Sequence, residues 1–160
     1  NALAAAACAN EFDVSLSLIK KGLEKTNTEK GRLELLESDR FTILDDSYNA
    51  NPHSMKAAID TLQSFSGEKI AVLGSMAELG ANSRVLHQEI GEYASQAGLD
   101  KLYTIGKDSK HYNGELFPDI GSLYNQLNER HLGATILIKG SRMMKLDELV
   151  DILSKTSISS

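Results

Sequence analysis

Four side chains that could bind a ligand lie close together in the stretch ILDDSYNANPHSM, residues 43–55. Asp45 and Asp46 directly follow an apolar run, and Asn49 and Asn51 come just before a proline. Carboxylates pair with cations and accept hydrogen bonds, whereas amides both donate and accept them. A turn from a strand into a helix needs about two such residues. The surplus therefore predicts a ligand or a partner at this turn.

Part of this stretch also has a purely structural interpretation. Asn is favoured as the N-cap of a helix and Pro at its first position, so Asn51 and the following proline can simply begin a helix. Asn49 and Tyr48 have no such task, and we expect one of them to face a neighbour. Strand alternation should direct one of Asp45 and Asp46 towards the helical layer and the other towards the ligand crevice.

A second cluster lies in the segment ILIKGSRMM near the end of the chain. Lys139 ends an apolar run, Gly140 can form the turn, and Ser141 can cap the next helix. Lys139 and Arg142 could bind a phosphate or a carboxylate. Alternatively, Lys139 could neutralise one of the two aspartates across the sheet, and both interpretations can hold together.

Both clusters are positioned by a regular alternation of strand and helix. Apolar runs predict strands at FTILDD, KIAVLG, KLYTIG and ATILIKG, and amphipathic segments predict helices over 52–65, 83–97, 120–131 and 143–153. Continuous apolar strands separated by helices are typical of a parallel sheet covered on both faces. The predicted fold class is therefore α/β, a doubly wound, mostly parallel sheet. The two clusters then meet at the carboxyl ends of its strands.

The first 39 residues do not follow this alternation. Their Ala-rich opening, residues 1–11, predicts a closely packed, buried helix with Cys8 in its core. We interpret residues 1–39 as the end of a preceding domain, residues 40–155 as the α/β domain, and residues 156–160 as a frayed tail. The sequence does not begin with Met, which fits a piece of a longer protein.

Composition narrows the class of protein. The formal net charge of −5 argues against nucleic-acid and membrane-surface binding, which both favour a basic face. No apolar run approaches the roughly 20 residues of a membrane span. A single cysteine excludes a disulfide framework and fits the cytoplasm. The histidines lack the spacing of metal ligands, so no metal site is predicted; they are His53, His87, His111 and His131.

Several motifs, taken in order, resemble the Mur ligases of peptidoglycan synthesis. They are NALAAAA, GR, DDSYNANP, AVLGSMAELG followed by LH, and ILIKGSR, and they cover nearly the whole chain to Leu153. DDSYNANP resembles the branch of this family that adds D-Ala-D-Ala. The resemblance implies three domains: one that binds the UDP-sugar, a central ATPase, and a Rossmann-like C-terminal domain. This chain would be the last of these, with the end of the central domain attached.

The resemblance implies ATP-dependent formation of an amide bond. ATP phosphorylates the terminal carboxylate of UDP-MurNAc-tripeptide, and the amine of D-Ala-D-Ala then attacks the acyl phosphate. The ligands of Mg²⁺ are expected upstream of this chain, in its own upstream domains. We therefore expect this chain alone to be inactive. The resemblance further implies a cytoplasmic, bacterial, monomeric enzyme.

The resemblance also implies roles for particular residues. Asn1 resembles an adenine-binding Asn, Arg32 the Arg that contacts the nucleotide phosphates, and Asp46 the Asp that binds the ribose hydroxyls. The residues that match the position facing the amino substrate, or lie beside it, are Lys139, Ser141, Arg142, Asn49 and Asn51. His53 and Ser75 depart from the family pattern, because many relatives have Asp at both positions.

Two other interpretations remain open at this stage. A response-regulator receiver is also doubly wound, and Asp45, Asp46 and Lys139 resemble its acidic pair and lysine. A receiver also needs a phosphoacceptor Asp at the end of a middle strand, where this chain has Ser75 and, less suitably, Asp108. The second alternative is a stand-alone nucleotide-binding module without catalytic activity.

Overall fold

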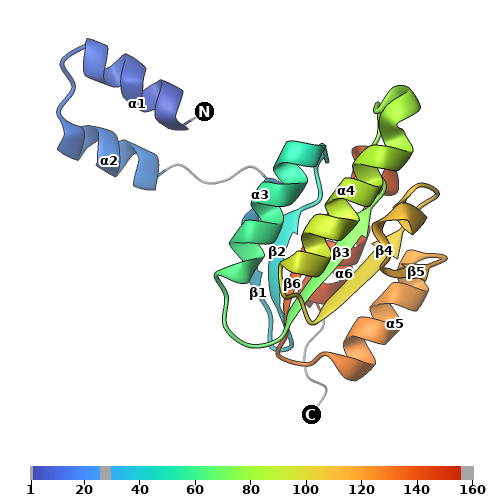
Figure 1. Ribbon diagram of the computed structural model, residues 1–160. Helices are drawn as coiled ribbons and strands as arrows, with labels where there is room; N and C mark the ends of the chain where they lie inside the picture. The colour runs from blue at the N-terminus through green and yellow to red at the C-terminus, as the bar shows by residue number, and fades with distance from the viewer. Residues whose placement is uncertain (1, 26–29, 156–160) are drawn as a thin grey trace.

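A mixed sheet forms the centre of the protein (Figure 1). The computed structural model describes residues 2–25 and 30–155 of the chain. Within them, the sheet has six strands in the order β1-β2-β6-β3-β4-β5. The strands are β1 (Glu34–Glu37), β2 (Thr42–Asp46), β3 (Lys69–Gly74), β4 (Lys101–Ile105), β5 (Glu115–Phe117) and β6 (Thr135–Lys139). Only β1 runs antiparallel to its neighbour, so the predicted fold class is confirmed.

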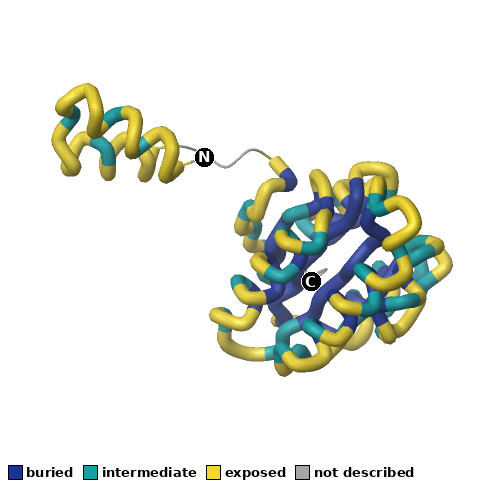
Figure 2. Tube along the Cα trace, turned by 45° about the horizontal axis from the view of Figure 1, so that its top comes forward, coloured by how far each residue is buried: buried dark blue, intermediate teal, exposed yellow. Residues whose placement is uncertain are grey.

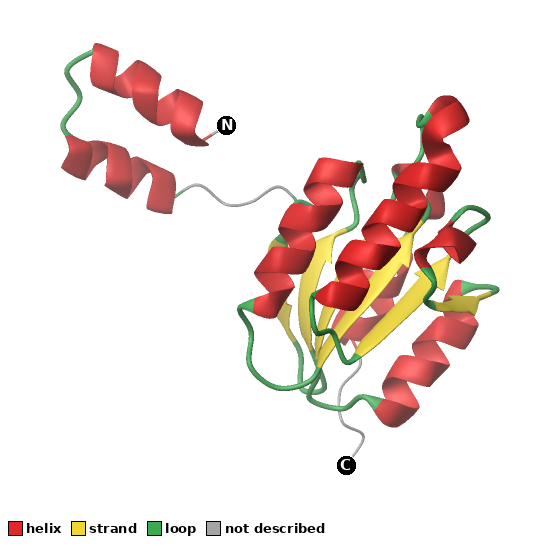
Figure 3. Ribbon diagram, viewed as in Figure 1, coloured by secondary structure: helices red, strands yellow, loops and turns green. Residues whose placement is uncertain are grey.

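Helices cover both faces of the sheet (Figure 3). The α-helices are α1 (Ala2–Glu11), α2 (Leu16–Glu24), α3 (Pro52–Gln63), α4 (Ser83–Gln96), α5 (Ile120–Arg130) and α6 (Asp147–Lys155). Among the described residues there are also three short 3-10 turns, η1 (Gly80–Asn82), η2 (Ser109–Tyr112) and η3 (Arg142–Met144). The last helix begins at 147 instead of the predicted 143, because η3 and a left-handed Lys145 (φ +50°) precede it.

Successive residues of the four inner strands, β2, β3, β4 and β6, enter two separate cores. In β6, Ile136 and Ile138 pack with α5 and α6, whereas Leu137 packs with α3 and α4. All five residues of this strand are buried, as the continuous apolar pattern predicted. Figure 2 shows the buried strands enclosed by partly exposed helices. Burial of one such aliphatic side chain stabilises the fold by roughly 1.5–3 kcal/mol.

The order of the parallel strands places a crevice beside β6. Taken in chain order, the parallel strands lie 1-5-2-3-4 across the sheet. A receiver of the flavodoxin-like type has the order 2-1-3-4-5, so the receiver alternative is wrong. The chain leaves β2 and β3 towards α3 and α4, but leaves β6 towards α6 on the opposite face. Connections that diverge in this way open a ligand crevice at the strand ends.

The first two helices lie apart from the sheet (Figures 1 and 2). Neither α1 nor α2 has a buried residue, and Cys8 is exposed. The prediction of a buried Ala-rich helix was therefore wrong for this chain, because the two helices mainly contact each other. Large apolar side chains are left exposed as a result; they include Leu3, Phe12, Leu16 and Leu18. No helix in the described ranges is both long and apolar enough to span a membrane.

Candidate functional site

The turn after β2 is shaped by a cap on helix α3. The side chain of Asn51 accepts a hydrogen bond from the amide of Ser54 at 2.9 Å, and Asn51 donates its own amide to the Ser54 hydroxyl at 3.1 Å. This reciprocal pair satisfies two backbone donors at the start of the helix. The structural interpretation of Asn51 is therefore confirmed.

A buried ion pair joins the ends of β2 and β6. Asp46 and Lys139 are register partners in parallel strands, so their side chains lie on the same face of the sheet. The Lys139 ammonium donates to Asp46 Oδ2 at 2.6 Å and to the carbonyl oxygen of Asn49 at 2.8 Å. Asp46 Oδ1 accepts the amide of Leu33 at 3.1 Å. Lys139 therefore neutralises Asp46 and also fixes the backbone of the turn.

The neighbouring Asp45 points to the other face of the sheet, as strand alternation predicted. It is fully buried, and its Oδ1 accepts the amide of Ser47 at 3.0 Å. Its Oδ2 has no hydrogen-bond partner among the described residues. Of the two aspartates, only Asp46 therefore reaches the lysine on β6.

Two arginines lie against one tyrosine at this rim. The guanidinium carbons of Arg32 and Arg142 lie 4.5 Å and 5.2 Å from the centroid of the Tyr48 ring. Tyr48 also donates its amide to the carbonyl of Gly31 at 3.0 Å, which ties the segment before β1 to the turn. Gly31 has a φ of +76°, and a Cβ there would lie 3.2 Å from the Tyr48 nitrogen. Tyr48 therefore links residues from three separate parts of the chain.

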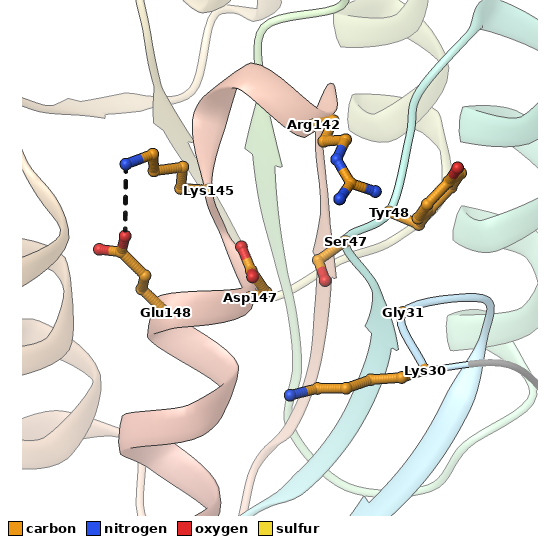
Figure 4. A pocket seen from close by; sticks show the side chains of 8 residues that line it. All are labelled: Lys30, Gly31, Ser47, Tyr48, Arg142, Lys145, Asp147 and Glu148. Carbon is orange, nitrogen blue, oxygen red and sulfur yellow. Dashed lines mark ion pairs between the residues drawn. The ribbon is translucent and has the colours of Figure 1, made fainter.

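One pocket opens beside this tyrosine on the α6 side (Figure 4). It encloses about 560 Å³ and is lined by Lys30, Gly31, Ser47, Tyr48, Arg142, Lys145, Asp147 and Glu148. Lys30 donates to Asp151 at 3.0 Å, and this bond raises the pKa of the lysine and lowers that of the aspartate. Three cations and two carboxylates line the pocket, so its lining carries an excess of one positive charge and can accept an anionic group.

A second pocket lies on the α3 side of the same tyrosine. It encloses about 430 Å³, and its lining is Tyr48, Asn49, Ala50, Asn51, Ala77, Glu78, Leu79, Ser141, Arg142 and Met143. Arg142 and Tyr48 line both pockets and so separate them. This pocket offers one carboxylate, one guanidinium and two amides to a small polar ligand.

The site residues that the sequence predicted within the range 30–155 all lie at one rim of the sheet. They are Arg32, Asp46, Asn49, Asn51, Lys139, Ser141 and Arg142, at or near the carboxyl ends of β2 and β6. Asn1 lies outside the described residues, as does the predicted tail 156–160. Ser141 precedes η3 without a capping bond from its side chain, contrary to the expected cap.

Sequence reasoning missed the contributions of Lys30 and Glu78 and the stacking role of Tyr48. The sequence did point to Tyr48 indirectly, because neither the turn nor the helix cap needs a tyrosine at this position. Ser75, a departure from the family pattern, has a structural role, because its hydroxyl accepts the amides of Asp108 and Ser109, each at 3.1 Å. No cluster of three potential metal ligands occurs among the residues that the structure describes.

The family model and the similar proteins found by comparison all belong to the Mur ligases. Residues 31–142 match the family model "Mur ligase, glutamate ligase domain". UDP-N-acetylmuramoyl-tripeptide–D-alanyl-D-alanine ligase of Escherichia coli K12 is 39% identical over 165 residues, covering 97% of this chain and 36% of that protein. The corresponding Bacillus subtilis ligase is 35% identical, covering 99% of this chain and 38% of the relative.

Solved structures of relatives have the same fold. MurF from Acinetobacter baumannii superposes with a TM-score of 0.84 at 32% identity, covering 97% of this chain and 36% of that one. MurF from Thermotoga maritima, solved in complex with ADP, gives a TM-score of 0.83 at 26% identity and covers 93% of this chain. This chain therefore spans little more than a third of the length of these relatives, 36% in both structures.

Proposed function

Because this chain belongs to the Mur ligase family, we propose that it is the C-terminal part of the ligase that joins D-Ala-D-Ala to UDP-MurNAc-tripeptide at the expense of ATP. The observation that carries the proposal is the stacking of Arg32 and Arg142 on Tyr48, which lies between two pockets in the turn that follows Asp46. One pocket would face the nucleotide and the other the dipeptide. The enzyme would act as a monomer in the bacterial cytoplasm.

The proposed division of the chain places residues 1–39 at the end of the central ATPase domain and residues 40–155 in the C-terminal domain. The relatives are almost three times as long, since this chain covers 36% of the first of them. The exposed apolar side chains of α1 and α2 support the proposal, because such surface is normally covered. In the full-length enzyme, the upstream domains would cover it.

On the nucleotide side, Arg32 would contact the phosphates and Asp46 would accept hydrogen bonds from the ribose hydroxyls. The cations of the 560 Å³ pocket fit an anionic ligand, and a carboxylate can accept more than the two bonds that Asp46 already receives. ATP supplies the phosphoryl group that activates the carboxylate of the peptide substrate. The described residues contain no group of three metal ligands, so the ligands of Mg²⁺ would come from upstream domains.

On the dipeptide side, Asn49, Asn51, Ser141 and Arg142 line the 430 Å³ pocket. Lys139 is only 2% exposed, so it would not contact the dipeptide itself. It would instead position Asp46 and the Asn49 carbonyl through its two hydrogen bonds. Closure of the domains over both substrates would exclude water from the reactive acyl phosphate.

Phosphate release tests this proposal. The full-length chain is given ATP, Mg²⁺, UDP-MurNAc-tripeptide and D-Ala-D-Ala, and residues 1–160 are assayed beside it. We expect release from the full-length chain only when both amide-forming substrates are present, and none from residues 1–160. Arg32→Ala and Asp46→Ala in the full-length chain should mainly raise the KM for ATP. Turnover by residues 1–160, or no dependence on D-Ala-D-Ala, would overturn the proposal.

A further inference from the structure

Glu78 has an unusual backbone conformation for its residue type. Its φ is +61°, in the left-handed region that side chains with a Cβ disfavour. It lies in the segment between β3 and η1, and its side chain is exposed. Residues held in this region without glycine occur where the surrounding structure fixes them, and they concentrate at functional sites.

The surrounding structure fixes the Glu78 segment from several sides. The amide of Met76 donates to Nε2 of the fully buried His87 at 3.0 Å. Nδ1 of His87 lies 2.7 Å from the carbonyl of Ser83, and a neutral ring with its proton on Nδ1 satisfies both contacts. The amide of Ser141 donates to the carbonyl of Ser75 at 3.1 Å. The segment is thus anchored to α4 and to the end of β6.

Glu78 shares the 430 Å³ pocket with a single cation, Arg142. Within residues 2–25 and 30–155, neither the Glu78 carboxylate nor the Arg142 guanidinium forms an ion pair. Arg142 is instead held against the ring of Tyr48. The pocket therefore presents one negative and one positive group that are held apart and remain available to a ligand.

A zwitterion has the complementary arrangement of charges. We infer that Glu78 binds the ammonium group of the dipeptide substrate while Arg142 binds its carboxylate, an assignment that rests on the proposed function. The amides of Asn49 and Asn51 line the same pocket and can bond the polar groups between the two charges. Glu78 would then be a specificity-determining residue, because it distinguishes a free amino terminus from a neutral one.

The test compares the full-length chain with its Glu78→Gln variant and a neutral analogue of the substrate. Propionyl-D-Ala has nearly the shape of D-Ala-D-Ala but lacks the ammonium group. We measure the KM for D-Ala-D-Ala and the inhibition constant of propionyl-D-Ala in both proteins. Loss of a charged hydrogen bond predicts a rise of roughly tenfold to hundredfold in the KM of the variant. The inhibition constant of propionyl-D-Ala should differ by less than about twofold between the two proteins, since the analogue has no ammonium group that could pair with the Glu78 carboxylate.

Glu92→Gln is the matched control, because Glu92 is exposed on α4 and lines neither pocket. It should leave both constants unchanged, and Glu78→Gln should leave the KM for ATP unchanged. Equal weakening of substrate and analogue, or of ATP, in Glu78→Gln would overturn the inference and indicate a structural role. An unmodified chain with no response to D-Ala-D-Ala would instead overturn the proposed function itself.

Discussion

The ammonium of Lys139 lies 2.6 Å from Oδ2 of Asp46, and the two residues are register partners in neighbouring parallel strands. The side chain of Lys139 is 2% exposed and that of Asp46 17% exposed. A charge in such a position is stable only when it is paired. The candidate nucleotide-binding carboxylate is therefore held in place by a lysine that lines neither pocket.

Removing this lysine should destabilise the fold. In Lys139→Met, the Asp46 carboxylate loses its partner while most of it stays buried, so we expect a loss of about 3 kcal/mol in the free energy of unfolding. Urea titration of residues 1–160 at pH 7 measures it. The double variant Lys139→Met/Asp46→Leu should be more stable than Lys139→Met alone. Lys56→Met, which breaks an exposed pair, should cost less than about 1 kcal/mol. Equal losses in the two lysine variants would contradict this prediction.

Removing the ring of Tyr48 should weaken both ligand sites together. Each arginine contact with the ring contributes roughly 0.5–1 kcal/mol, so Tyr48→Leu should raise the KM values for ATP and D-Ala-D-Ala by about twofold to fivefold each. Tyr48→Phe keeps the ring and should behave like the unmodified full-length chain. The control is Tyr93→Leu, since Tyr93 makes a similar contact with Lys56, at 5.4 Å, away from the rim. A change in only one KM would show that the tyrosine does not connect the sites.

Substitution of Asn51 should mainly affect stability, whereas substitution of Asn49 should mainly affect binding of D-Ala-D-Ala. Asn51→Ala removes the helix cap and should lower the free energy of unfolding by about 1 kcal/mol. Among the described residues, the side chain of Asn49 accepts only the amide of Ala50, at 2.8 Å, and the bond from Lys139 to its backbone carbonyl does not depend on the side chain. Asn49→Ala should therefore change stability by less than about 0.5 kcal/mol. In the full-length chain, Asn49→Ala should mainly raise the KM for D-Ala-D-Ala. Thermal unfolding and kinetics together check this; the reverse pattern would assign the substrate contact to Asn51.

Stability should fall at alkaline pH through Tyr112. Burial raises the pKa of its phenol above the ordinary value of 10.0. Above about pH 10 the unfolded chain releases this proton while the folded chain retains it, so rising pH favours unfolding. Tyr112→Phe loses the hydrogen bond to the Gly74 carbonyl, about 1 kcal/mol at neutral pH, but its stability should then decline less steeply between pH 10 and 11. Parallel pH curves for the two proteins would contradict the prediction.

The sequence by itself determined the fold class and most of the elements. Apolar runs such as those of β3 and β6 have only one stable environment, the middle of a parallel sheet covered on both faces. Asn51 and Pro52 likewise specified the start of α3, because capping depends on local residues alone. The meeting of the Asp46 turn with the Lys139 turn followed from the rule that parallel strands end at one edge.

Only the tertiary structure decided how the residues at that edge pair. The insertion of β6 between β2 and β3 excluded a receiver and made Lys139 the partner of Asp46, and strand order is not encoded in any local pattern. The stacking of Arg32 and Arg142 on Tyr48 joins residues far apart in the chain. The local sequence could not predict that α1 is exposed, because an Ala-rich helix is buried only if another surface covers it.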